Sequence, residues 1–309
     1  MGPDMNAIGA VSTITINIDP VLQIGPLPIH WYGIFYALAF FTAYQLGVLP
    51  LALRKGVSRA VAERIAVWTI VFGLIGARLY YDVQQPDFVH NYLLNPINLI
   101  AFWQGGMAFF GAIIAGMATL AVLAWRHRIN PWMVLDGGMV FAVVGQPIGR
   151  FGNLINGDIL GDRSNLPWAT GYAFQNPPGG DHCAILQQGF HCVGDAGGPW
   201  FYQPAAAYEA LGTLVIGLVL LLLYRRNVRN GILTLTYVPL YAISQLVIFM
   251  FRASEPPGPF GLREAQWTAI AVLVIGTPLL YVLWARTAAR LEARYVAART
   301  PATPAATAT

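Results

Sequence analysis

The chain alternates between long runs of apolar residues and short polar connections. Seven of the runs reach or approach the roughly 20 residues that an α-helix needs to cross the hydrocarbon core of a bilayer. They cover residues 31–53, 66–83, 101–125, 133–149, 205–224, 232–251 and 265–285. A membrane barrel would instead show segments of about ten residues with alternating polarity. The pattern therefore predicts an all-α polytopic membrane bundle of seven transmembrane helices.

The composition supports this fold class. Of the 309 residues, 56% are hydrophobic and only 10% are charged, whereas roughly 25% are charged in soluble domains. Such a chain cannot cover a water-facing surface with polar groups, so lipid is expected to surround most of it. The first thirty residues have neither a basic segment nor a clean apolar core. No cleaved signal peptide is therefore predicted.

The basic residues predict the orientation of the bundle. Thirteen of the 18 lysines and arginines fall in alternate connections and in the tail. They are Arg54, Lys55, Arg59 and Arg64, then Arg126 and Arg128, then Arg225, Arg226 and Arg229, and finally Arg286, Arg290, Arg294 and Arg299. By the positive-inside rule these connections face the cytoplasm, which predicts an outer N-terminus and a cytoplasmic C-terminus. Because the basic residues do not cluster on one segment, no nucleic-acid partner is predicted.

The expected organisation is a single transmembrane domain over residues 1–285. A long polar loop at 162–204 interrupts it on the outer face. Residues 286–309 form a cytoplasmic tail, and the Ala-, Thr- and Pro-rich end at 300–309 is expected to be disordered.

Three arginines lie near the predicted outer ends of their helices, the side that the positive-inside rule disfavours. They are Arg78, Arg150 and Arg252. A cation at this depth needs a partner or a function. The arginines could serve as anchors that pair with Asp82 and Glu209, or they could form part of a binding site.

The segment GRFGNLINGDILG, residues 149–161, combines polar side chains with glycines. The polar residues are Arg150, Asn153, Asn156 and Asp158, and the glycines are Gly149, Gly152, Gly157 and Gly161. Glycine permits close backbone approach, and the planar donor fork of arginine suits a phosphate group. The segment therefore predicts a pocket for a phospholipid headgroup. The alternative is a glycine-rich re-entrant turn whose polar groups satisfy each other.

Further polar residues are expected at the same level. Tyr32 opens the first predicted helix, and Tyr208 and Glu209 lie one turn into the fifth. A carboxylate within a membrane segment is a functional-site hypothesis by default. Tyr241 and Gln245 are four residues apart in the sixth helix, so they share one face.

The loop at 162–204 contains the two cysteines of the chain, Cys183 and Cys192. In an oxidising compartment they can form a disulfide. Two neighbouring histidines, His182 and His191, also permit a metal site, and we favour the disulfide.

The segment GRFGNLINGDILG resembles the signature of the prolipoprotein diacylglyceryl transferase family. Other segments resemble motifs of this family in the same order along the chain. They are IGPLPIHWYG (24–33), GARLYYD (76–82), WQGGMAFFG (103–111), PAAAYE (204–209) and LYAISQLVIFMFR (240–252). The resemblance covers roughly residues 17–285 and agrees with the seven-helix topology.

The resemblance implies transfer of the diacylglyceryl group of phosphatidylglycerol to the lipobox cysteine thiol of preprolipoproteins. Glycerol phosphate leaves and a thioether forms, at the outer face of the bacterial cytoplasmic (inner) membrane. The implied partners are phosphatidylglycerol or another anionic phospholipid, the signal peptide of a preprolipoprotein, and the bilayer. No metal or organic cofactor is implied.

The site residues follow from the resemblance and from side-chain chemistry. Catalytic roles are expected for Arg150, Glu209, Asp158 and Tyr241. Substrate-binding roles are expected for Asn153, Asn156, Gly157, Gly161, Tyr32, Arg78, Tyr208, Gln245 and Arg252. Arg150 would hold the phosphate, while Glu209 or Asp158 would orient the arginines or act as the base.

The chain departs from the usual family pattern at several of these motifs. Leu154 and Asp158 replace Phe and Glu, Phe110 replaces His, Gln245 replaces Arg, Phe249 replaces Glu, and Gln203 replaces His in a His-Pro-Ser-Gln motif. Two hypotheses follow: a transferase with a divergent site, or a non-catalytic lipid-binding homologue that serves as a structural subunit of a membrane complex. A transporter is less consistent, because its polar groups would gather near the midplane.

Overall fold

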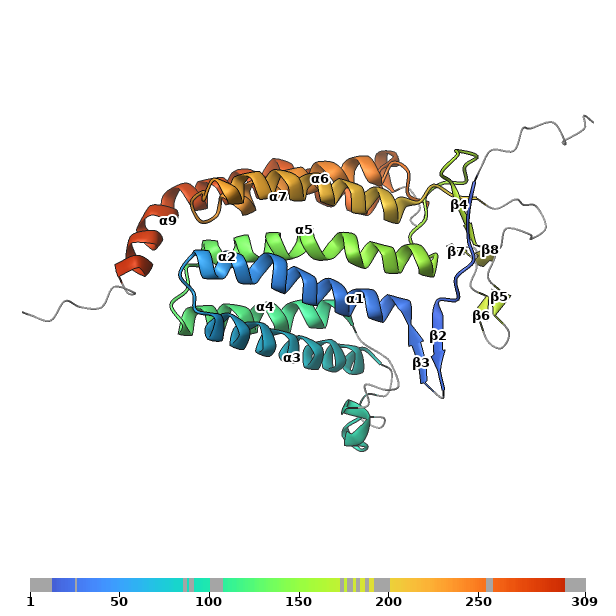
Figure 1. Cartoon of the computed structure of the whole chain (residues 1–309), viewed down its shortest axis with the longest axis horizontal. Helices are drawn as coiled ribbons and strands as arrows, with labels where there is room; N and C mark the ends of the chain where they lie inside the picture. Colours follow the sequence, from blue (N-terminus) through green and yellow to red (C-terminus); the bar gives the residue numbers. More distant parts are fainter. Residues whose placement is uncertain are drawn as a thin grey trace, which may run out of the picture. The chain divides into compact units, whose positions relative to one another are not determined.

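The computed structural model describes residues 13–25, 27–85, 88, 92–100, 108–172, 175–176, 180–181, 184–186, 189–191, 201–253 and 258–297. Most of these residues are helical (Figure 1). The chain divides into two compact units. The first unit comprises Met1–Gly47 and Gly138–Trp284, and the second comprises Val48–Gly137 and Ala285–Thr309.

Helices form nearly all of the secondary structure. They are α1 (Trp31–Thr42), α2 (Leu49–Arg54), α3 (Arg59–Gln84), α4 (Phe109–Arg126), α5 (Pro131–Asn156), α6 (Ala205–Arg225), α7 (Ile232–Ile248), α8 (Glu264–Ala271) and α9 (Thr277–Ala297). The π-helical turn η1 (Ala43–Val48) joins α1 to α2, and η6 (Val272–Gly276) joins α8 to α9. Two 3₁₀ turns, η3 (Pro96–Ile100) and η5 (Pro259–Gly261), lie in the connections.

In the part of the chain that the structure describes, five helical stretches are long and apolar enough to cross a membrane. They are Trp31–Arg54, Arg59–Gln84, Pro131–Asn156, Ala205–Arg225 and Glu264–Tyr295. Phe110–Arg126 and Ile232–Ile248 are apolar but shorter. The prediction of a helical multi-pass membrane protein is thus confirmed.

The helix bounds differ from the predicted runs at several places. The second helix, α3, begins at Arg59 rather than at residue 66, and α9 continues to Ala297 rather than ending at residue 285. The third run was expected from residue 101, but α4 begins at Phe109, and residues 101–107 lie outside the described part. The fourth run was expected to end at residue 149, but α5 continues to Asn156. Arg150, Asn153 and Asn156 therefore lie within the helix rather than in a turn after it. Their spacing of three residues places them near one helix face.

Short strand pairs accompany the helices, which the all-α prediction did not include. In the first unit, β1 (Ile14–Ile16) pairs in parallel with β4 (Thr170–Tyr172), and β2 (Val21–Ile24) pairs antiparallel with β3 (Leu27–His30). Two hairpins follow, β5 (Gln175–Asn176) with β6 (Gly180–Asp181) and β7 (Ala184–Leu186) with β8 (Gly189–His191). Pairing satisfies backbone groups that the polar connections would otherwise leave without partners.

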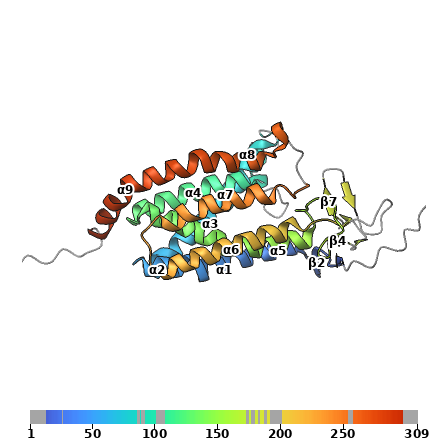
Figure 2. The ribbon, with the colours of Figure 1, turned by 90° about the horizontal axis from the view of Figure 1, so that it is seen from above.

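Small residues bring the helices of the first unit together, and α1, α5 and α6 run side by side (Figure 2). A Cβ on Gly145 would lie 3.4 Å from the Cβ of Ala43, at the end of α1. A Cβ on Gly217 of α6 would lie 3.4 Å from the Cβ of Val143. Such contacts are typical of membrane helices, because they allow backbones to approach closely.

In the second unit, α3 and α4 form a helical pair (Figure 1). They cross at two glycines, since a Cβ on Gly76 would lie 2.6 Å from the carbonyl oxygen of Gly111. The start of α5 is tied to α9 by a hydrogen bond of 3.0 Å from Trp132 Nε1 to Thr287 Oγ1.

Candidate functional site

A buried carboxylate lies between two arginines in the first unit. Glu209, near the start of α6, is 3% exposed. Arg252 Nη1 donates to Glu209 Oε1 at 3.2 Å, and Arg150 Nη2 forms an ion pair with Glu209 Oε2. A buried charge needs pairing because its desolvation is costly. The two guanidinium groups and Glu209 together carry a formal charge of +1, which the carboxylate of Asp158, reached through Asn153, offsets.

The signature segment extends this cluster into a hydrogen-bonded network. Arg150 Nη1 donates to Asn153 Oδ1 at 3.3 Å. Asn153 Nδ2 donates to both carboxylate oxygens of Asp158, at 3.1 and 3.2 Å, and Asn156 Nδ2 donates to Asp158 Oδ2 at 3.2 Å. The polar residues that the sequence singled out do satisfy each other, but as part of a helix end. We call Arg150, Asn153, Asn156, Asp158, Glu209 and Arg252 the charged network.

Gly157 ends α5 and lets the chain turn back toward the helix. Its φ of +73° is in the left-handed region that favours glycine. A Cβ at Gly157 would lie 3.2 Å from the ring of Tyr172, whose hydroxyl donates to the carbonyl of Leu154 at 2.8 Å. Burial raises the pKa of Tyr172, so this hydroxyl keeps its proton. Gly157 therefore acts through the backbone by positioning Asp158.

Gly161 joins the segment that carries Arg252 to the loop before α6. It forms an antiparallel bridge with Arg252, and its N–H donates to the carbonyl of Gln203 at 2.7 Å. A Cβ here would lie 2.8 Å from the Cβ of Gln203. Only a glycine fits, and its role is to align the segment of Arg252 with the network.

Two tyrosines lie beside the charged network. Tyr32 interacts electrostatically with Asp158 and Arg150, and its hydroxyl donates to Tyr36 at 2.8 Å. Tyr241 of α7 interacts with Glu209, Arg150 and Arg252. The structure thus brings two of the three predicted tyrosines, Tyr32 and Tyr241, to the cluster.

Tyr208 contacts the same region through its ring and its hydroxyl. Its hydroxyl accepts a hydrogen bond of 2.7 Å from Trp168 Nε1, and its ring lies 6.2 Å from that of Phe251. Trp168 was missed in the sequence, because its position in a polar loop gave no periodic signal.

Gln146 is a second residue that the sequence reasoning missed. Thr213 Oγ1 donates to Gln146 Oε1 at 3.3 Å, and Tyr237 and Tyr241 also interact with its amide. It lies four residues before Arg150 on α5, so the helical period could have placed it on the same face.

Two departures from the family pattern lie on α7 or directly after it. Gln245 is half-buried, and in the described part of the chain its side chain makes no hydrogen bond to the charged network. Phe249 is 4% exposed, and the guanidinium of Arg252 lies 4.7 Å from its ring centroid. Phe249 thus supports Arg252 through a cation–π contact.

Arg78 belongs to the second unit and has its own partners. It is 3% exposed, its Nε lies 3.1 Å from Asp82 Oδ1, and its Nη2 donates to the carbonyl of Asn98 at 2.6 Å. Asp82 is one of the two partners that the sequence suggested for the outer arginines. Phe110, where the family usually has histidine, is 67% exposed at the start of α4.

The predicted disulfide falls outside the described residues, since these include neither cysteine. Among the residues that the structure does describe, no group of three or more His, Cys, Asp or Glu side chains could hold a metal ion.

The helices and the charged network define a multi-pass membrane protein with an arginine-rich polar cluster where its helices end. A model of the prolipoprotein diacylglyceryl transferase family matches residues 20–282, so the chain belongs to this family. The family expectation drawn from the motifs is thereby confirmed.

Relatives from several bacteria match most of the chain. A protein of Synechococcus elongatus is 29% identical over 85% of this chain and 86% of its own length. One of Halalkalibacterium halodurans is 29% identical over 91% of each chain, and one of Parasynechococcus marenigrum is 32% identical over 83% of this chain and 91% of its own. Each relative bears the name phosphatidylglycerol–prolipoprotein diacylglyceryl transferase.

Proposed function

We propose that this protein transfers the diacylglyceryl group of phosphatidylglycerol to the lipobox cysteine of preprolipoproteins. The observation that carries the proposal is the charged network, with Arg150 and Arg252 held around the buried Glu209. The names of the relatives supply the substrates. The network supplies the chemistry that such a reaction needs.

The reaction forms one bond and breaks another. The cysteine sulfur attacks the glyceryl carbon that carries the phosphate. A C–S bond forms as the C–O bond breaks, and the electron pair of that bond leaves with the phosphate oxygen. Glycerol phosphate departs as an anion, and the thiol proton passes to a base. The nucleophile comes with the substrate, so the protein needs only a base and an anion site.

The arginines are suited to the leaving group. Arg150 is 23% exposed and Arg252 is 17% exposed, so both reach the surface of the cluster although Glu209 does not. Preorganised cations stabilise charge that develops in a transition state. Arg150 would therefore bind the departing phosphate while Glu209 holds both guanidinium groups in position.

The remaining network residues would orient the substrate and the base. Asp158 accepts hydrogen bonds from Asn153 and Asn156, and this keeps both amides fixed. Asp158 and Glu209 are the candidate bases, and Tyr241 interacts with Glu209. Tyr32 and Tyr208 would border the headgroup.

The strand pairing supports seven membrane crossings. Because β1 and β4 pair directly, they lie on one side of the membrane, and an even number of crossings must separate them. The helical stretches between them number four: α1 with α2, α3, α4 and α5. Four crossings require α4 to span, although its 18 residues extend only about 27 Å.

The same reasoning applies to the other half of the chain. Gly161 and Arg252 form a bridge, so α6 and α7 together make two crossings. The last helical stretch, Glu264–Tyr295, is the seventh. With the basic connections inside, the N-terminus and the loop at 162–204 lie outside, and the tail at 286–309 lies in the cytoplasm. This topology fits the bacterial inner membrane and a single transmembrane domain over residues 1–285.

A non-catalytic lipid-binding homologue is the second candidate function. It is favoured by Phe110, Gln245 and Phe249, where the family usually has His, Arg and Glu. Phenylalanine cannot transfer a proton, and the loss of one donor from an anion site costs about 10²- to 10³-fold in rate. Such a protein would keep the lipid site and serve in a membrane complex.

The deciding experiment measures transfer directly. The purified protein receives phosphatidylglycerol and a lipobox peptide, and mass spectrometry detects the diacylglyceryl-modified cysteine. We expect modification by the wild type and by Arg64→Ala, which removes an exposed arginine, but not by Arg150→Ala. An inactive wild type that still copurifies with phospholipid would overturn the transferase proposal and support the second candidate.

A further inference from the structure

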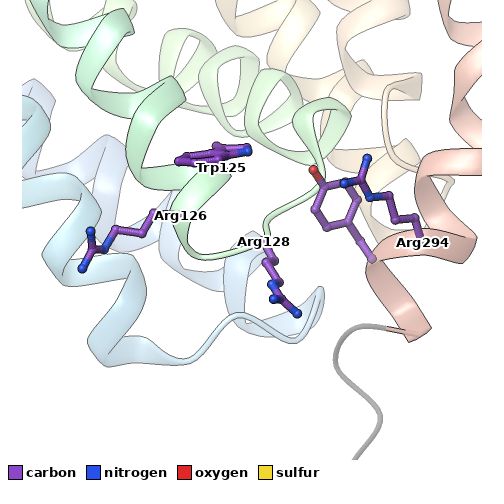
Figure 3. A pocket seen from close by; sticks show the side chains of 5 residues that line it. Trp125, Arg126, Arg128 and Arg294 are labelled. Carbon is purple, nitrogen blue, oxygen red and sulfur yellow. The ribbon is translucent and has the colours of Figure 1, made fainter.

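A separate hollow lies in the second unit, where α4 ends near the last turns of α9. Its volume is about 570 Å³, and it is lined by Trp125, Arg126, Arg128, Arg294 and Tyr295 (Figure 3). Trp125 and Arg126 end α4, Arg128 follows in the turn, and Arg294 belongs to α9. None of these residues belongs to the charged network. We call this feature the arginine hollow.

The arginines of the hollow are not neutralised by carboxylates. All three are exposed, and in the described ranges none of them forms a salt bridge. Two carboxylates of the same unit, Asp136 and Glu292, interact electrostatically with Lys55 instead. The hollow therefore keeps an unbalanced positive charge that favours an anion.

The backbone holds one of these arginines in an unusual conformation. Arg128 has a φ of +52°, in the left-handed region that residues other than glycine rarely adopt. Hydrogen bonds from Arg128 N to Trp125 O (3.1 Å) and from Ile129 N to Ala124 O (2.8 Å) fix this turn. These two bonds form a Schellman motif, a common way for a helix to end, so the end of α4 fixes where the backbone of Arg128 lies beside the hollow.

The positive-inside rule explains why arginines occur in this connection, but it does not explain their convergence on one hollow. Nor does it explain the aromatic residues there. Trp125 is 76% exposed, and Arg294 lies 5.9 Å from the ring centroid of Tyr295. Exposed tryptophan and tyrosine are typical of the membrane interface.

We propose that the arginine hollow binds the phosphate group of a phosphate ester. Guanidinium groups offer paired donors that match phosphate oxygens, and the volume lies within the range of small-molecule sites. Two sources share this chemistry: the headgroup of an anionic phospholipid, and a soluble phosphate monoester. Basic pockets near membrane helix ends commonly take lipid headgroups.

The test compares two double variants that lose the same charge. Arg128→Gln with Arg294→Gln removes two cations of the hollow. Arg64→Gln with Arg286→Gln removes two exposed cations of the same unit that do not line it. Both keep the charged network, so lipid bound there contributes equally. Native mass spectrometry in detergent measures binding of dioleoyl phosphatidic acid and of dioleoyl phosphatidylcholine, and calorimetry measures binding of glycerol 1-phosphate.

We expect phosphatidic acid to bind at least about tenfold more weakly to the hollow variant than to the matched variant, and phosphatidylcholine to show no such difference. If glycerol 1-phosphate also binds more weakly to the hollow variant than to the matched variant, the phosphate source is a soluble ester. If only phosphatidic acid binds more weakly, the source is a lipid headgroup. Equal binding by both variants, or equal losses in both, would overturn the proposal. Transfer activity retained by the hollow variant serves as the control for folding.

Discussion

At the scale of single residues, Glu209 supplies the buried negative charge that the two arginines of the network need. Both Arg150 and Arg252 contact its buried carboxylate. Its replacement would leave two partly buried cations without that counter-ion. Breaking a buried ion pair from one side costs roughly 3–5 kcal/mol, because the remaining charge keeps its desolvation penalty.

We therefore predict that Glu209→Gln lowers the free energy of unfolding by about 3–5 kcal/mol. The matched control is Glu63→Gln, which removes the exposed carboxylate that pairs with Arg59 at 3.4 Å. An exposed pair of this spacing contributes only about 0.3–0.5 kcal/mol. Thermal unfolding in detergent compares the two variants, and losses of similar size would contradict the central role of Glu209.

Gln245 and Phe249 replace two charged residues that the family usually has four positions apart. Arginine and glutamate at this spacing would face each other on one helix side. The chain thus differs at both members of one pair.

A double-mutant cycle tests this coupling. We predict that Gln245→Arg and Phe249→Glu each lower the midpoint of thermal unfolding. The double variant should be less destabilised than the sum of the two changes, by a coupling of about 0.5–3 kcal/mol. Additive effects in the four proteins of the cycle would show that the two positions do not interact.

The site residues with polar side chains could be named from the sequence, because arginine, asparagine and glutamate within apolar runs are rare. Their partners could not all be named. Trp168 bonds to Tyr208 across a long stretch of chain, and no local pattern reports such a contact. The bidentate hydrogen bonds from Asn153 to Asp158 also depend on the turn at Gly157, whose geometry is set by Tyr172.

At the scale of elements, hydropathy located the helices but misjudged where α5 ends. The apolar run stops at residue 149, and Arg150 was therefore assigned to the end of the helix. The helix continues to Asn156 because Arg150, Asn153 and Asn156 find partners on one face. Hydropathy measures the preference for lipid, whereas a helix can continue wherever its side chains are satisfied.

The crossing of α3 and α4 depends on two glycines. A Cβ on Gly76 would lie 2.6 Å from the carbonyl oxygen of Gly111, so we predict that Gly76→Ala forces the helices apart. The expected cost is about 1–3 kcal/mol. Gly116→Ala is the control, because its Cβ would meet ordinary contacts at 3.7 Å or more. Equal midpoints of thermal unfolding for the two variants would contradict this close packing.

At the scale of the whole molecule, the sequence predicted the class of fold and the family, but not the short strand pairs. Strands of three or four residues are too short to show a period of two. Yet the direct pairing of β1 with β4 is the observation that best supports an even number of crossings between residues 16 and 170.

The proposed seven crossings would place the two ends of the chain on opposite sides of the membrane. We predict that a membrane-impermeant maleimide labels Asn17→Cys in intact cells but labels Ala289→Cys only after lysis. Both positions are exposed. Cys183 and Cys192 are replaced by serine in both variants to remove their own labelling. Labelling of both cysteines from outside would contradict an odd number of crossings.

The ion pair between α5 and α6 also has a consequence for biogenesis. Arg150 is synthesised before Glu209, and Arg252 after it, so the first cation enters the translocation machinery ahead of its carboxylate. At about 5–20 residues per second, the delay lasts several seconds. During that time the partner of Arg150 within the charged network is Asn153. We therefore expect the arrival of α6 to complete the ion pair of Arg150.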